Sequence, residues 1–295
     1  MRIKTVNGII AFFILVMPQF VFGQLTLKGH ICDSETSIGI PYCSVIIKSI
    51  EQGTMTNESG YFEITLPNSC SEKQPIEISS LGYDPLHTEL IDILNLDTIF
   101  LKSKFFDIQE VVIKGSQSKK YKLGVKRSAS SNGSYSFCTK QISQMALYIP
   151  NSKGITGYIS AISFRINKNI GVPNSPFRLR VFEKTDTTDA PGNDLLHQSV
   201  IIQGGENGGW VTSDVDSLHI LFPSNGLFVG LEWLYNYSYI NKKGVECYNH
   251  SIDLTGTINE QRTWIRSLAK NWNKWVLFDR QPAHNIMIEI IVKGN

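Results

Sequence analysis

Along much of the chain, apolar and polar residues alternate in short runs that are separated by turn-forming residues. The clearest early run covers residues 25–31, where Leu, Leu, Gly and Ile alternate with Thr, Lys and His. Alternation with a period of two predicts a β-strand that buries one face. Further strands are expected at residues 41–48, 61–66 and 76–80, at intervals typical of a β-sandwich.

Residues 135–295 repeat this pattern at greater length. Strands are expected at residues 155–166, 177–182, 200–202, 218–222, 227–234 and 284–292. The one candidate for a helix of more than a turn or two is 259–268. Many strands joined by loops rich in Gly and Asn predict a jelly-roll-like β-sandwich for this half, so the whole chain is predicted to be all-β.

Two turn motifs in the N-terminal part are more specific than the alternation. Residues 57–62 read Asn-Glu-Ser-Gly-Tyr-Phe, and Gly60 is expected to adopt a positive φ, which glycine reaches without steric cost. Residues 78–83 read Ile-Ser-Ser-Leu-Gly-Tyr. Together with Gly29 and Val45, these motifs resemble the carboxypeptidase-regulatory-like domain, a transthyretin-like β-sandwich of secreted and outer-membrane proteins of the Bacteroidetes type.

The resemblance spans residues 24–115 and carries several implications. It implies a scaffold that has no chemistry of its own, and it implies closing strands at residues 96–101 and 108–113. The C-terminal region also resembles, more loosely, domains that follow this module in uncharacterised secreted proteins. The expected architecture is therefore an N-terminal transthyretin-like sandwich at 24–115 followed by a C-terminal sandwich at 135–295.

Residues 1–23 have the features of a secretory signal peptide. Arg2 and Lys4 precede an apolar stretch at residues 8–17, and the small residue Gly23 suits the cleavage position. The apolar stretch is too short to cross a bilayer, which needs roughly 20 residues. We therefore expect export to the periplasm, the outer-membrane surface or the medium; an uncleaved anchor is the alternative.

Residues 116–134 are rich in Ser, Lys, Gly and Asn, which predicts a basic, flexible linker between the two domains. The chain has 28 Lys and Arg against 26 Asp and Glu, a net charge of +2. Loss of residues 1–23 removes two basic and no acidic residues, so the net charge becomes zero. Charge therefore gives no reason to expect nucleic acid or an anionic membrane surface as a partner.

The sequence has five cysteines, so at least one thiol stays unpaired within the chain. Their spacings match no zinc motif of the C-x-x-C kind. Cys43 lies in an apolar strand and is expected to be a buried free thiol. Export would permit a disulfide among the five, and Cys32 and Cys43 could come close enough to pair if their strands are neighbours.

No motif of a common enzyme class is present. The chain lacks a His-x-x-Glu zinc pair, a G-x-S-x-G nucleophile motif, a P-loop and a dinucleotide fingerprint. We therefore expect a non-enzyme. The alternatives are a polysaccharide or cell-wall hydrolase that uses C-terminal carboxylates, or an accessory protein of a TonB-dependent transporter. For a hydrolase, Glu232 is the candidate, because an aromatic neighbour such as Trp233 could raise its pKa.

Two features leave room for ligand binding. Tyr235, Tyr237 and Tyr239 alternate with other residues and would share one face of an extended strand, where exposed rings could stack on sugars. The loop 186–194 offers oxygen ligands that suit calcium in extracellular modules. These oxygen ligands are Asp186, Asp189, Asn193 and Asp194. An ordinary turn is the favoured interpretation of the loop, and burial in the core is the alternative for the tyrosines.

Taken together, these features predict a secreted or cell-envelope binding or adaptor protein. Its expected partners are a glycan or an envelope protein, engaged through the C-terminal sandwich. No cofactor is expected apart from possible calcium, and no transmembrane segment is expected once the signal is removed.

Overall fold

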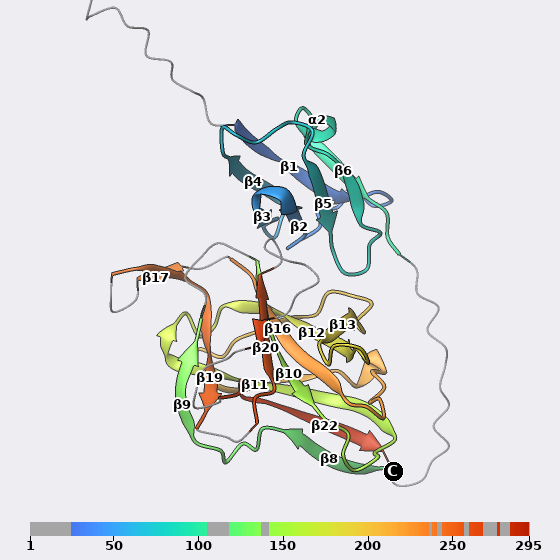
Figure 1. The fold of residues 1–295 in the computed structure, drawn as a ribbon, viewed down its shortest axis with the longest axis vertical. Coiled ribbons are helices and arrows are strands. Elements are labelled where there is room, and N and C mark those ends of the chain that lie inside the picture. The colour runs from blue at the N-terminus through green and yellow to red at the C-terminus, as the bar shows by residue number, and fades with distance from the viewer. Residues whose placement is uncertain are drawn as a thin grey trace, which may run out of the picture.

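A computed structural model describes most of the chain, in two β-sandwich modules stacked one above the other (Figure 1). The described residues are 25–104, 118–136, 142–235, 238–240, 244–256, 260–267, 276–277 and 284–294. The all-β fold class expected from the sequence is confirmed. The predicted signal peptide at 1–23 and the predicted strand at 108–113 lie outside the described residues.

The N-terminal module is built from two small sheets. One has the strand order β4-β1-β7 and the other the order β3-β2-β5-β6. β1 pairs antiparallel with β4 and parallel with β7, which confirms the predicted closing strand at 96–101. Its elements are β1 (Leu25–Asp33), β2 (Ser44–Ile47), the 3-10 turn η2 (Lys48–Ile50), β3 (Gln52–Met55), β4 (Tyr61–Leu66), β5 (Pro75–Ser79), β6 (Leu86–Glu89), α2 (Leu90–Ile93) and β7 (Thr98–Leu101).

The alternation in β1 and β4 explains how the two sheets form one core. Leu27 and Ile31 on β1 and Phe62 and Leu66 on β4 are buried, while the residues between them face outward. Burying one face of each strand is what a sandwich requires. These side chains meet Val45 of β2 across the interior of the module.

Gly60 sets the turn between the two sheets. Its φ is +82°, which confirms the positive φ expected from the sequence. A Cβ at this position would lie 2.7 Å from the Gly39 Cα and 2.7 Å from the carbonyl oxygen of Ile31. Glycine is therefore required here both by the backbone angle and by the space available.

The C-terminal module contains a large sheet with the order β13-β12-β16-β10-β20-β21, in which β14 also pairs with β12. A second sheet has the order β8-β22-β11-β19-β9, in which β15 also pairs with β11. Their elements are β8 (Lys119–Gly124), β9 (Ser131–Tyr135), β10 (Ser143–Ile149), β11 (Gly157–Gly171), β12 (Pro176–Lys184), β13 (Pro191–Asp194), β14 (Ile201–Gln203), β15 (Gly209–Asp214), the 3-10 turn η3 (Asp216–Leu218), β16 (Leu227–Trp233), β19 (His250–Thr255), β20 (Thr263–Ser267), β21 (Val276–Leu277) and β22 (Ile288–Gly294). The inner faces of the two sheets enclose one core, and the small hairpin β17 (Ser238–Ile240) and β18 (Glu246–Tyr248) extends from the module.

The structure corrects two predictions. The predicted flexible linker at 116–134 is wrong from residue 119 onward, because β8 and most of β9 lie within it and pair with β22 and β19. In β8 the inward side chains of Tyr121 and Leu123 alternate with lysines, and the lysines dominate the composition. The candidate helix at 259–268 is also wrong for the described part, where β20 is a strand.

The two modules meet through a small apolar contact. Tyr42, Ile46 and Met55 of the N-terminal module pack with Ile142 and Leu234 of the C-terminal module. Tyr235 is half-buried against the same cluster. Burial of apolar surface at this contact favours a fixed arrangement of the modules.

The cysteines fall into two groups. Cys32, Cys43 and Cys70 are free thiols, and the expectation that Cys43 is buried and free is confirmed. Burial raises the pKa of the Cys43 thiol to about 12, so the thiol stays protonated at neutral pH. Cys247 is disulfide-bonded, and the remaining cysteine of the sequence, Cys138, lies outside the described residues.

Over the part of the chain that the structure describes, no helix has the length and apolar character needed to cross a membrane.

Replacing Gly60 with Ala is expected to destabilise the protein more than the same change at Gly154. Both residues have positive φ, but a Cβ at Gly154 meets nothing within 4 Å. Gly154→Ala should cost about 1 kcal/mol from the backbone angle alone, and Gly60→Ala should cost several times as much. Urea unfolding of the two variants measures the difference; equal losses would contradict the close approach at Gly60.

Candidate functional site

A row of polar side chains crosses the outer face of the large C-terminal sheet, where the N-terminal module covers it. In the strand register, Arg178 of β12 lies opposite Glu232 of β16, and Glu232 lies opposite Gln144 of β10. Gln144 in turn lies opposite Arg266 of β20. Directly opposed residues on one sheet face are close enough to interact, so the register alone brings these four side chains together.

Arg178 is the centre of this polar row, and all three arms of its guanidinium are bonded. Its Nη1 donates to Glu232 Oε1 over 2.7 Å, and its Nε donates to Ser199 Oγ over 3.0 Å. Its Nη2 donates over 2.6 Å to the backbone carbonyl of Tyr42, in the N-terminal module. Only 2% of the Arg178 side chain and 1% of the Glu232 side chain are exposed. A buried charge therefore holds the two modules together directly.

The other carboxylate oxygen of Glu232 is also occupied. Gln144 Nε2 donates to Glu232 Oε2, and Arg266 Nε donates to Gln144 Oε1 over 2.9 Å. Arg180 Nη1 lies 3.6 Å from the same Oε2. The side-chain amide of Gln144 thus links the Glu232 carboxylate to the guanidinium of Arg266.

The charges around Glu232 decide its protonation state. Burial alone raises the pKa of the Glu232 carboxyl, but Arg178 and Arg180 outweigh burial and the net shift is downward. Burial also lowers the pKa of Arg266, to about 9, against the opposing effect of Glu232. The pKa of Glu232 is therefore not raised, contrary to the possibility considered from its aromatic neighbour. An ionised, fully bonded carboxylate is unsuited to act as a general acid.

A cleft of ≈240 Å³ lies beside the row and is lined by residues of both modules. Arg178, Arg180 and Glu232 line it from the C-terminal module, and Ser44 and Ser79 line it from the N-terminal module. Most of the charged groups at this cleft are already bonded to one another. The cleft is thus part of the contact between the modules, and its charged groups are paired within the protein.

The structure does not bring the four predicted calcium ligands together. Asp194 Oδ2 lies 2.9 Å from Arg180 Nε, and Asp189 Oδ1 lies 2.6 Å from Lys184 Nζ. Asn193 donates from Nδ2 to Glu183 Oε1 over 2.6 Å, and Asp186 Oδ1 accepts from Asn225 Nδ2 over 3.5 Å. Each oxygen-bearing side chain is thus engaged with its own protein partner.

Within the described ranges, no group of three or more His, Cys, Asp or Glu side chains is placed to hold a metal ion. Asp194 is largely buried, and burial raises the pKa of its carboxyl against the opposing effect of Arg180. Its role in the structure is to neutralise Arg180 at the end of the polar row.

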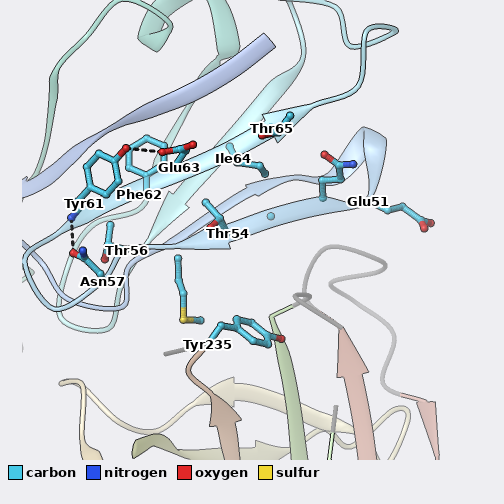
Figure 2. Close-up of a pocket in the computed structure, with 13 residues that line it drawn as sticks. Glu51, Thr54, Thr56, Asn57, Tyr61, Phe62, Glu63, Ile64, Thr65 and Tyr235 are labelled. Carbon is cyan, nitrogen blue, oxygen red and sulfur yellow. Dashed lines mark hydrogen bonds between the residues drawn. The ribbon is translucent and has the colours of Figure 1, made fainter. Parts of the chain in front are cut away.

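A larger groove of ≈710 Å³ lies on the side of the N-terminal module (Figure 2). Strands β3 and β4 form its two walls, the turn at residues 56–57 closes one end, and Glu51 lies at the other. Glu63 and Thr65 on β4 are exposed along it. The hydroxyl of Tyr61 donates to Glu63 Oε2 over 2.7 Å and fixes the position of that carboxylate.

Tyr235 connects this groove to the predicted glycan platform. Its side chain enters the base of the groove from the C-terminal module and is half-buried there (Figure 2). Burial raises the pKa of its hydroxyl. Tyr237 lies outside the described residues, and the side chain of Tyr239 is not described. The shared face of the three tyrosines stays a prediction, with Tyr235 at the module contact.

One buried pair superficially resembles hydrolase chemistry. Ser175 Oγ lies 3.2 Å from His250 Nδ1, and the His250 ring packs on Phe177 and Trp233. Both Ser175 and His250 are fully buried, and no described group bonds to His250 Nε2. Burial lowers the pKa of His250 to about 3, so the ring is neutral and fills the core.

The arginines of the polar row were missed from the sequence, although a signal was present. The strand predicted at residues 177–182 begins with a Phe-Arg-Leu-Arg-Val pattern, which places two arginines on one face. Arginine at alternate positions normally indicates a solvated face. Only the position of the N-terminal module over this face shows that the arginines are buried.

Comparison with known families agrees with the N-terminal half of the sequence interpretation. Residues 27–113 match the family model described as "CarboxypepD_reg-like domain". This match supports the domain resemblance drawn from the turn motifs. No curated protein matches the chain.

Among solved structures, two of the clostridial cysteine protease Cwp84 give matches of low similarity. One is a variant after propeptide cleavage, with 9% identity and a TM-score of 0.37, covering 92% of this chain and 71% of that chain. The other holds the cysteine protease and lectin-like domains of Cwp84, a surface-layer-associated protein of Clostridium difficile, with 11% identity and a TM-score of 0.35. It covers 92% of this chain and 64% of that chain, and at these TM-scores neither match carries an argument about function.

Replacing Arg178 with Met is expected to destabilise the protein strongly. The change leaves Glu232 buried without its main partner and removes the bond to the Tyr42 carbonyl. Loss of one partner from a buried pair costs about 3–5 kcal/mol, whereas loss of an exposed pair costs under about 1 kcal/mol. Urea unfolding should show this contrast with Lys293→Met, whose partner Asp216 is exposed. Equal effects would mean that the buried pair does not stabilise the junction.

The buried His250 predicts a loss of stability in mild acid. Its folded pKa of about 3 lies below the usual value of 6.5, so the unfolded chain binds a proton that the native state does not. Stability from this group is complete above pH 6.5 and falls as the pH drops toward 3, by about 2 kcal/mol at pH 5. Urea unfolding at pH 7 and pH 5 should show that the free energy of unfolding decreases less for His250→Phe than for the wild type. The exposed control His87→Phe should retain the wild-type decrease, and an unchanged decrease in His250→Phe would contradict this assignment.

Proposed function

We propose that this chain is an exported binding or adaptor protein of the cell envelope, of the Bacteroidetes secreted type, without catalytic activity of its own. The observation that carries the proposal is the groove between β3 and β4, which Tyr235 of the second module completes at its base. A concave surface shared by two modules suits recognition of a partner, because both modules contribute to it.

Two features support export. The first is the signal-like pattern of residues 1–23. The second is the disulfide at Cys247, because disulfides persist mainly in oxidising compartments outside the cytosol. The proposed location is accordingly the periplasm, the outer-membrane surface or the medium.

The chemistry of the buried polar groups favours binding over hydrolysis. A glycosidase needs one carboxyl group that can donate a proton and a second that faces it across the substrate. Glu232 is ionised and bonded on both oxygens, and Asp194 is paired with Arg180. Neither carboxylate is free to serve in such a pair.

In the proposed role, the two modules present their surfaces in a fixed relation. The bond from Arg178 to the Tyr42 carbonyl and the apolar contact around Met55 hold the N-terminal module against the C-terminal sandwich. The proposed partners are an envelope glycan or an envelope protein.

The purified full-length chain should bind a defined envelope component, tested on a glycan array and by affinity capture from envelope extracts of the native organism, each with and without calcium. The same preparations should release no reducing ends or amino termini from the bound polymer. A matched variant, Asp186→Ala with Asp189→Ala, tests whether any calcium effect involves the loop 186–194. Release of products from the bound polymer would overturn the non-catalytic assignment. Absence of binding in both formats would overturn the binding role.

A further inference from the structure

The groove is bordered by the open edges of two sheets. β3 is the outermost strand of the four-stranded sheet and β4 is the outermost strand of the three-stranded sheet. Both border the groove, so two rows of backbone groups approach it from opposite sides. An unpaired strand edge is a template for pairing with another extended segment.

The hydrogen-bonding phase of β4 shows which backbone groups face the groove. The amide of Ile31 donates to the carbonyl of Gly60, and the amide of His30 donates to Asp97 on the other side of β1. In an antiparallel ladder the direction alternates, so Phe62 and Ile64 bond to β1 while Glu63 and Thr65 point away from it. No hydrogen bond among the described residues occupies the backbone groups of Glu63 and Thr65.

The same argument applies to β3. The amide of Thr56 donates to the carbonyl of Cys43, so the alternate residue Thr54 also bonds toward β2. Gly53 and Met55 therefore direct their N–H and C=O groups toward the groove. Gly53 has no side chain, which leaves this edge unobstructed.

The edge of β4 lacks the commonest protection, whereas β3 is only four residues long. Sheet proteins commonly protect exposed edges with lysine, proline or a covering loop. Neither β3 nor β4 contains a lysine or a proline. The groove of ≈710 Å³ runs along both edges and offers space for an extended segment beside β4.

The charge of the groove indicates what kind of segment it would take. Glu51 and Glu63 line it, and the described lining residues include no lysine or arginine. Lys28 faces Glu63 across the β1–β4 ladder but does not line the groove. The ring of Tyr235 at the base offers a flat surface for an aliphatic or cationic side chain.

We propose that the groove binds an extended, basic peptide segment of a partner protein by strand addition to β4, with Glu63 and Thr65 forming the backbone bonds. Main-chain bonds then provide affinity, and the exposed carboxylate of Glu63 selects lysine or arginine beside it on the incoming strand. This inference rests on the proposed binding function and specifies the partner as a protein segment rather than a glycan.

The test uses the purified protein and a fluorescein-labelled octapeptide that alternates lysine and threonine, with a glutamate–threonine octapeptide as its counterpart. Fluorescence anisotropy should show that the basic peptide binds at least tenfold more tightly than the acidic one. Raising the salt concentration should weaken that binding, because the selecting charges are near the surface. Equal affinity for the two peptides would overturn the proposal.

Two proline variants separate strand addition from simple charge attraction. Glu63→Pro removes an outward-facing amide without breaking a bond to β1, and it should weaken the basic peptide at least tenfold. The matched control is His87→Pro on β6, the opposite edge of the four-stranded sheet, where the amide also faces outward. His87→Pro should bind as the wild type does. Glu63→Gln retains the amide and should weaken binding only a few-fold.

Hydrogen exchange of the wild-type protein keeps the proposal testable if Glu63→Pro fails to fold. Addition of the basic peptide should slow exchange at the amides of Glu63 and Thr65 and leave those of His87 and Glu89 unchanged. Unchanged exchange at Glu63 and Thr65 would overturn the proposal.

The outcomes also separate this inference from the function on which it rests. If envelope extracts or glycans bind but the basic peptide does not, only the strand-addition site fails. If nothing binds in any format, the binding role fails as well. If ultracentrifugation shows a dimer that Glu63→Pro abolishes, the edge pairs with a second copy and the peptide proposal is overturned.

Discussion

The pair formed by Arg178 and Glu232 is the constraint on which the arrangement of this molecule depends. Both side chains are almost wholly removed from water, and a charge in that position is tolerated only when every polar atom has a partner. Neighbouring strands of the large sheet supply Glu232 and Gln144 in register, the loop before β14 supplies Ser199, and the carbonyl of Tyr42 comes from the other module. The N-terminal module is thus required to complete the hydrogen bonding of the C-terminal sheet, which explains why two sandwiches with separate cores form one unit.

This constraint also determines where the molecule can interact with others. The charged groups at the junction bond to one another, so they are unavailable for proton transfer or metal binding. The groups that face the groove are of another kind, namely the backbone edges of β3 and β4 and the exposed side chain of Glu63. Docking of the modules places Tyr235 at the base of that groove. The chemistry that suits such a surface is recognition of an extended chain, since unpaired strand edges bond most readily to another strand.

Much of the fold follows from local features of the sequence. Alternation in β1 and β4 identifies strands with one buried face, and the positive φ of Gly60 follows from a turn that only glycine fits. Local features gave a wrong prediction where the composition of a segment indicated a linker but its alternation indicated a strand. The lysines of β8 resemble a linker, yet Tyr121 and Leu123 between them are sufficient for a strand once β22 provides an edge to pair with. The stretch around Thr263 became a strand because β10 offered a partner edge.

The sequence by itself determined the all-β class, the turn motifs of the N-terminal module and the absence of common catalytic motifs, because each depends on residues close together in the chain. The tertiary structure alone decided the site. Oxygen-bearing residues of the loop 186–194 are neighbours in sequence, yet their side chains bond to separate partners. Arg178 and Tyr42 are far apart in sequence and bond directly. Burial and pairing depend on which surfaces meet, and that is set by the packing of whole sheets rather than by any local pattern of residues.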